Sequence, residues 1–124
     1  MSIKGRPYAW LRASLERGDL PGVRSAATEL PRIHLADALA IVLLMAADED
    51  PAYERAATRW LARLASERPT VTLQDLAGAV AALLALRGAH PARAALAELC
   101  ARHDVGTVIG LPSEGAAQRG RARP

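Results

Sequence analysis

The residue types that most often bind metals or act as nucleophiles are scarce in this chain, which has three histidines and one cysteine. Cys100 and His103 lie three positions apart, so on a helix they would share a face, and Asp104 follows directly. A structural zinc site takes four ligands, and this pair supplies two. We therefore predict no metal site. We expect Cys100 to act as a small core residue and His103 to stand near a helix C-terminus, where the dipole favours it.

The carboxylates give little indication of acid–base catalysis, because most of them stand where helices should begin. Asp19, Asp50 and Asp75 are expected to cap helices. Asp37, three residues after His34, could face inward beside an apolar helix, but an acid in a first helical turn also stabilises the helix N-terminus. The chain has no glycine-rich phosphate loop of the known kind. The sequence predicts no catalytic residue and no bound cofactor.

A row of basic residues is the most specific charged feature. Arg55, Arg59 and Arg63 recur every four positions, which places them along one side of a helix. Such a row could contact an anion or a partner. Glu67 continues the same row, which favours an ordinary solvated face. Together with the basic ends of the chain, the row makes a nucleic-acid-associated protein the alternative function.

The segment that carries this row also carries an apolar stripe. Its members recur at helical spacing and are Tyr53, Ala57, Trp60, Leu61 and Leu64. We expect Trp60 to anchor the helix in the core. If Trp60 were exposed instead, with Tyr53 beside it, the two aromatic residues would mark a partner-binding patch.

Glycine, proline and capping residues divide the chain into six predicted helices, at about residues 6–17, 20–30, 35–47, 51–68, 72–87 and 91–103. Gly18 supplies the left-handed residue that commonly ends a helix. Pro51 suits the first turn of the fourth helix. Thr72 and Asp75 have the spacing of a capping box at the start of the fifth.

Two of these helices are apolar nearly all round, in the stretches LADALAIVLLMAA (35–47) and LAGAVAALLAL (76–86). Such helices must be covered on several sides, so we predict that both lie in the interior. Residues 105–112 are apolar and too few for a sheet, and we expect them to lie extended across the helical body. Residues 113–124 are predicted to form a disordered basic tail, which leaves a single domain over residues 1–112.

The helix breaks pair the six helices into three antiparallel hairpins of about 35 residues each. In YAWLRASLERGDLPGV, residues 8–23, Trp10 stands early in a helix and Gly18 and Asp19 stand at its turn. This pattern resembles the tetratricopeptide and HEAT classes of helical-hairpin repeats, across residues 7–103. The resemblance implies a stack of hairpins with a protein-binding surface. A compact six-helix bundle is the alternative architecture.

Composition supports an all-α fold, because only 3% of residues are aromatic and phenylalanine is absent. The apolar runs are shorter than the roughly 18 residues that a membrane span needs, so we expect no membrane association. The two ends hold five of the sixteen basic residues and one of the thirteen acidic ones, so residues 7–112 are close to neutral. The first ten residues lack the apolar stretch of a secretory signal, and a single cysteine suits a reducing cytoplasm.

The alanine and arginine content is the bias of a GC-rich coding sequence, and we expect a bacterial protein. Because no motif indicates a reaction, the expected function is a non-catalytic protein-interaction or regulatory adaptor module with a protein partner. Self-association through an uncovered apolar face is a further expectation.

Overall fold

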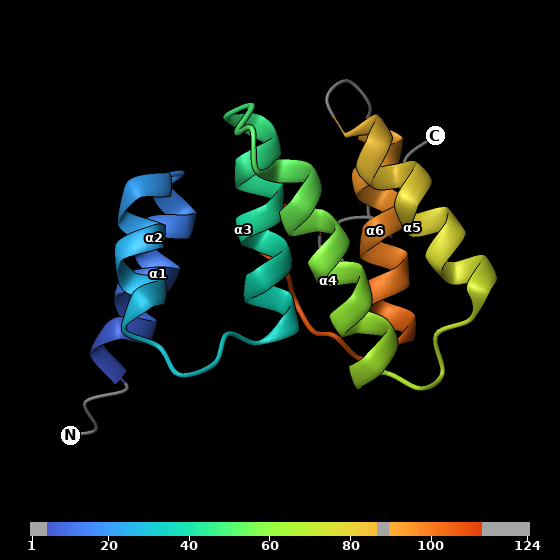
Figure 1. The fold of residues 1–124 in the computed structure, drawn as a ribbon, viewed down its shortest axis with the longest axis horizontal. Helices are drawn as coiled ribbons and strands as arrows, with labels where there is room; N and C mark the ends of the chain where they lie inside the picture. The colour runs from blue at the N-terminus through green and yellow to red at the C-terminus, as the bar shows by residue number, and fades with distance from the viewer. Residues whose placement is uncertain (1–4, 87–89, 113–124) are drawn as a thin grey trace, which may run out of the picture.

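A computed structural model describes residues 5–86 and 90–112 of the chain (Figure 1). This part contains six α-helices and no strand, which confirms the predicted all-α class. The helices are α1 (Gly5–Arg17), α2 (Leu20–Thr28), α3 (Leu35–Ala47), α4 (Tyr53–Glu67), α5 (Leu73–Ala85) and α6 (His90–Arg102). The predicted tail over residues 113–124 and the predicted end of the fifth helix at about residue 87 lie outside the described residues.

Local signals explain why several helices begin and end where they do. Gly18 has a φ of 70°, in the left-handed region, at the turn between α1 and α2. The Asp19 side chain caps α2 by accepting a hydrogen bond from the backbone N–H of Gly22 at 3.0 Å. Thr72 and Asp75 form both hydrogen bonds of the predicted capping box at the start of α5.

The fourth helix begins two residues later than the sequence predicts. Pro51 and Ala52 form a turn, and Ala52 occupies the N-cap position of α4. Asp50 supports this turn, because its carboxylate accepts a hydrogen bond from the backbone N–H of Ala52 at 2.8 Å. That bond is the largest of the effects that hold the pKa of Asp50 below its usual value, and Arg24 adds to them.

The helices pack as three consecutive hairpins, α1 with α2, α3 with α4, and α5 with α6. The hairpins stand side by side along the longest axis of the molecule, with α1 and α2 at one end and α5 and α6 at the other (Figure 1). Between hairpins, α3 contacts α1 and α2, and α4 contacts α5. The hairpin arrangement therefore leaves two end faces, one at each terminus of the row.

The core is centred on α3, as predicted for this apolar helix. Eight of its thirteen residues are buried, and neighbours lie on both sides of it in the row. From α4, Trp60 is 2% exposed, and its indole N–H donates a hydrogen bond to the carbonyl of Leu35 at 2.9 Å. From α1, Leu11 is fully buried. Apolar side chains of α1, α2 and α4 pack around α3, and their burial is the main source of stability.

The prediction that both apolar helices lie in the interior is wrong for α5. Only Ala79, Ala82 and Leu83 are buried within this helix, with Leu86 buried just after it. The reason is position, because α5 belongs to the last hairpin of the row and no further hairpin of the described chain packs on its outer side. An apolar composition on all sides therefore does not by itself place a helix in the core.

Residues 105–112 follow α6 without helix or strand and pack on the helices. Val105 and Val108 are buried in the core cluster. Gly110 lies against the side chain of Leu43 in α3, and its carbonyl accepts a hydrogen bond from Arg93 of α6 at 3.0 Å. The segment thus links α6 to the central helix. Among the described residues, none of the helices has the length and apolar content needed to cross a bilayer.

Candidate interaction surface

The outer side of α5 is a continuous apolar surface that faces solvent. Leu73 is 86% exposed, Leu84 is 74% exposed and Val80 is 42% exposed. Ala77 and Ala81 are exposed between them. These five positions follow the spacing i, i+4, i+7, i+8 and i+11, so they share one side of the helix, opposite the buried residues. We call this surface, formed by Leu73, Ala77, Val80, Ala81 and Leu84, the α5 face.

A polar network fixes the N-terminal end of α5 against the end of α6. The Asp75 carboxylate lies 2.9 Å from Nε2 of His103, and Nδ1 of His103 lies 2.9 Å from the Thr70 hydroxyl. Arg102 donates to the other oxygen of Asp75 at 3.3 Å. If Nε2 carries the proton, it donates to Asp75, and the Thr70 hydroxyl donates to Nδ1. Thr70 lies in the turn before α5 and the other groups lie at the ends of α5 and α6, so the network holds these two helices in one orientation.

Asp75 is kept ionised by this setting. Its pKa is lowered from the usual value of 3.8, chiefly because its carboxylate accepts a hydrogen bond from the backbone N–H of Thr72. Hydrogen bonds from the Thr72 side chain and from His103 lower the pKa further, as does the positive charge of Arg102. The Asp75 carboxylate therefore caps the N-terminus of α5 and also binds the side chains of Arg102 and His103 at the end of α6.

His103 has a different role from the one that the sequence suggested. It stands just after the C-terminus of α6, as expected, but it is buried and faces Asp75 rather than solvent. Arg68, at the end of α4, donates hydrogen bonds to the carbonyls of His103 at 3.0 Å and Asp104 at 3.3 Å. The residue thus belongs to a polar contact between the ends of three helices.

The Cys100–His103 pair is not part of a metal site in the described structure. No group of three potential ligands comes together within residues 5–86 and 90–112. Cys100 is 2% exposed and belongs to the apolar core. Burial raises the pKa of its thiol to about 11, which keeps it protonated at neutral pH and therefore a poor nucleophile or ligand.

The structure separates the other two candidates for acid–base chemistry. His34 is exposed at the N-cap position of α3, and its side chain makes no capping hydrogen bond. Asp37 is 3% exposed and pairs instead with Arg12 of α1, at 3.2 Å. Asp37 therefore faces inward, as one of the two interpretations held, but its partner is a distant arginine and not His34.

The basic row on α4 is divided in two. Arg55 and Arg59 are exposed and line an open hollow of about 630 Å³ together with Glu54. Arg63 turns to Glu67, with Nε 2.8 Å from the carboxylate, and also donates to the carbonyl of Ile33 at 2.8 Å. The hydrogen bond from Arg63 is the main reason that the pKa of Glu67 is lowered. Two arginines, rather than three, therefore remain directed to solvent on this row.

Tyr53 and Trp60, the two aromatic residues of α4, both serve packing. Trp60 is buried, and its indole N–H donates the hydrogen bond to the carbonyl of Leu35 in α3 described above. Tyr53 is half-buried, and its hydroxyl donates to the carbonyl of Leu83 in α5 at 2.6 Å. The pair does not form an exposed aromatic patch. Instead, Tyr53 ties the last two hairpins together.

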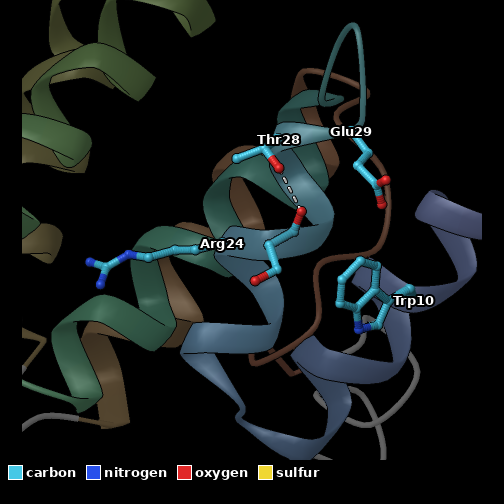
Figure 2. Close-up of a pocket in the computed structure, with 5 residues that line it drawn as sticks. Trp10, Arg24, Thr28 and Glu29 are labelled. Carbon is cyan, nitrogen blue, oxygen red and sulfur yellow. Dashed lines mark hydrogen bonds between the residues drawn. The ribbon is translucent and has the colours of Figure 1, made fainter.

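Sequence reasoning missed two features, the α5 face and a hollow beside Trp10. Trp10 is 41% exposed, whereas Leu11 and Leu15 of the same helix are buried. It lines a hollow of about 430 Å³ with Glu29 and other residues of α2 (Figure 2). No sequence signal short of the hairpin geometry itself could have shown that Trp10 and Glu29 meet.

The chain was compared with protein-family models, with curated proteins and with solved structures, and none of them matches it.

Proposed function

We propose that the protein is a non-catalytic protein-interaction module whose partner packs a helix on the α5 face. The observation that carries this proposal is the exposure of Leu73 and Leu84, at 86% and 74%, on a helix that has no charged residue from position 76 onward. Two leucines this exposed on one side of a helix, with Val80 between them, leave an apolar surface that a partner can cover.

A helix is the partner that best fits this surface. The face is a straight apolar strip on a helix, with Ala77 and Ala81 between the larger side chains. Small residues at these positions let a second helix approach closely and place its apolar side chains between Leu73, Val80 and Leu84. Within the molecule α4 already packs beside α5 in the same row, so a partner helix would continue the existing arrangement. This is helix recognition through an apolar stripe.

The size of the face favours a different protein over a second copy. Thirteen helical residues span about 20 Å, and a strip about 10 Å wide therefore offers roughly 200 Å². Burying it would contribute ~5 kcal/mol, which is close to the lower estimates of the cost of association. Two copies paired through α5 alone would bury about 400 Å², well below the roughly 1,200 Å² of a stable interface. A partner that also reaches neighbouring helices can exceed this limit.

Other features support the same conclusion. The charge-poor α5 face is unsuited to a phosphate backbone, and on α4 the engagement of Arg63 by Glu67 reduces the row that the nucleic-acid alternative uses to Arg55 and Arg59. The buried, protonated thiol of Cys100 is in keeping with a reducing bacterial cytoplasm, where we place the protein.

The experiment is site-specific photo-crosslinking. A photoreactive amino acid replaces Ala81, which is exposed on the α5 face, in the full chain, and crosslinked peptides from a lysate of the source cells are identified by mass spectrometry. We expect one partner segment with an apolar stripe at helical spacing. The double variant Leu73→Gln, Leu84→Gln should lose the captured protein, while the matched control Arg55→Gln, Arg59→Gln retains it. Circular dichroism shows that both variants stay folded.

Three outcomes would contradict the proposal. One is crosslinking only to other copies of this chain, together with a dimer in light scattering, which would make the α5 face a self-association surface. Another is capture that the double variant at Leu73 and Leu84 leaves unchanged. The third is capture that is lost with the arginine variants instead, which would place the interaction on α4.

A further inference from the structure

A hollow of about 430 Å³ lies at the opposite end of the molecule from the α5 face, between α1 and α2. Its described lining residues are Trp10 from α1 and Arg24, Ser25, Thr28 and Glu29 from α2 and its C-cap. Because α1 and α2 form an antiparallel hairpin, the first half of α1 lies beside the C-terminal end of α2. That geometry brings Trp10 and Glu29, nineteen positions apart, to one hollow (Figure 2).

Trp10 gives the hollow an aromatic wall. It is 41% exposed, although a tryptophan in a chain of this size is usually used for packing, as Trp60 is. The face of an indole ring carries negative electrostatic potential and attracts organic cations, more strongly than tyrosine or phenylalanine does. An open indole beside a carboxylate is therefore suited to a cationic ligand.

The charges around the hollow favour a cation as well. Glu29 is exposed and lines the hollow with its carboxylate. The helix α2 ends at Thr28, so the negative end of its dipole adds to the charge of Glu29. The Thr28 hydroxyl is occupied, because it donates to the carbonyl of Ser25 at 2.7 Å.

Arg24, the one described basic residue in the lining, does not neutralise Glu29. Its guanidinium is hydrogen-bonded to Asp50, at the start of the next hairpin loop. In Figure 2 the Arg24 side chain extends away from Trp10 and Glu29, on the other side of α2. The part of the hollow between Trp10 and Glu29 therefore carries a net negative charge.

We propose that this hollow binds the guanidinium group of an arginine side chain in a basic segment of a partner polypeptide. A guanidinium is planar, so it can stack on the indole of Trp10 while its N–H groups donate to the Glu29 carboxylate. An ammonium group offers charge without a flat face, and it binds more weakly here. This site is independent of the α5 face, and either proposal can fail without the other.

The test is an NMR titration of the full chain at low ionic strength with a short synthetic peptide that contains arginine between glycines. The chain has two tryptophans, so the indole N–H of buried Trp60 serves as an internal reference for that of Trp10. We expect the Trp10 signal to shift and the Trp60 signal to stay. The same peptide with citrulline, which keeps the shape without the charge, should cause no shift, and the lysine peptide should bind more weakly.

Matched variants separate this site from general charge attraction. Glu29→Gln removes the charge with little change of shape, and Trp10→Leu removes the ring. Each should weaken binding by about two- to five-fold, which is the effect expected for an exposed ion pair or an exposed cation–π contact. Glu16→Gln is the control, because Glu16 is exposed on α1 but does not line the hollow. Binding to that variant should equal binding to the parent chain.

Several results would overturn the proposal. Equal shifts with the citrulline peptide would show that charge is not recognised. Equal weakening by Glu16→Gln and Glu29→Gln would show that the peptide is attracted to acidic side chains of the surface in general and not to the hollow. Unchanged affinity in Glu29→Gln or Trp10→Leu would exclude the corresponding group, and the Trp60 signal confirms in each case that the variant is folded.

Discussion

The ion pair between Arg12 and Asp37 joins α1 to α3, and its two members differ in burial. The carboxylate of Asp37 lies 3.2 Å from Arg12, with 5% of the Asp37 side chain exposed against 37% of the Arg12 side chain. Loss of Arg12 would leave a buried carboxylate without its cation, whereas loss of Asp37 would leave a guanidinium that can turn to water. We predict that Arg12→Ala lowers the free energy of unfolding by ~2–4 kcal/mol, somewhat less than for a fully buried pair, because water screens Arg12.

Removal of Asp37, the other member of the pair, should destabilise the fold much less. Asp37→Leu keeps an apolar contact with the core and should lower the free energy of unfolding by about 1 kcal/mol or less, mostly through the lost interaction with the N-terminus of α3. In the Asp37→Leu background, Arg12→Ala should then have little further effect, because no buried charge remains. Arg17→Ala is the control on the same helix. Its pair with Asp19, at 3.6 Å, is exposed at both ends and should contribute about 0–1 kcal/mol.

Urea unfolding followed by circular dichroism measures the four free energies of the cycle and that of the control. A cost of Arg12→Ala within about 0.5 kcal/mol of the cost of Arg17→Ala would refute the reasoning, because it would show that Asp37 is not buried in solution. The same conclusion would follow if Arg12→Ala cost as much in the Asp37→Leu background as in the parent.

Three further predictions follow from single sites. Trp60→Ala should lower the free energy of unfolding by ~3–5 kcal/mol, because the ring is 2% exposed, and a urea midpoint equal to that of the parent would contradict its core position. The pKa of Asp75 is lowered in the folded chain, so the ionised carboxylate should stabilise the fold fully at pH values above its usual pKa of 3.8. This stabilisation should be lost as the pH falls through the lower pKa of the folded state. The difference in the free energy of unfolding between the parent and Asp75→Asn should therefore become smaller at acidic pH. A difference that does not change with pH would contradict the role of the Asp75 carboxylate. Cys100, with its pKa raised to about 11, should react with a disulfide reagent only slowly until urea unfolds the chain, and fast labelling of the native protein would show that the thiol is accessible.

The features that the sequence predicted well depend on residues close together in the chain. The left-handed turn at Gly18, the Asp19 cap and the Thr72–Asp75 capping box each join groups no more than three positions apart. Backbone geometry fixes such contacts once a helix forms, so the residue types alone indicate them. The six helices and the central position of α3 follow in the same way from breaks and apolar content.

The contacts between helices and the hollow beside Trp10 could not be predicted, because their members come from distant positions in the chain. Arg12 meets Asp37 across 25 positions, and His103 meets Asp75 across 28. Trp10 and Glu29 share a hollow only because α1 and α2 are antiparallel. The four-residue spacing on α4 also gave a wrong expectation for Arg63. Its side chain donates to the carbonyl of Ile33, in the loop before α3, and the spacing within α4 holds no information about that loop.

The sequence alone therefore determined the helical class, the helix limits to within a few residues and most caps, because these depend on local backbone preferences and apolar content. The tertiary structure decided which apolar side chains are covered. The stretches in α3 and α5 are similarly apolar, but α3 lies between the first hairpin and α4, whereas α5 ends the row. Exposure depends on the number of neighbours a helix has, and only the packing of the whole chain sets that number.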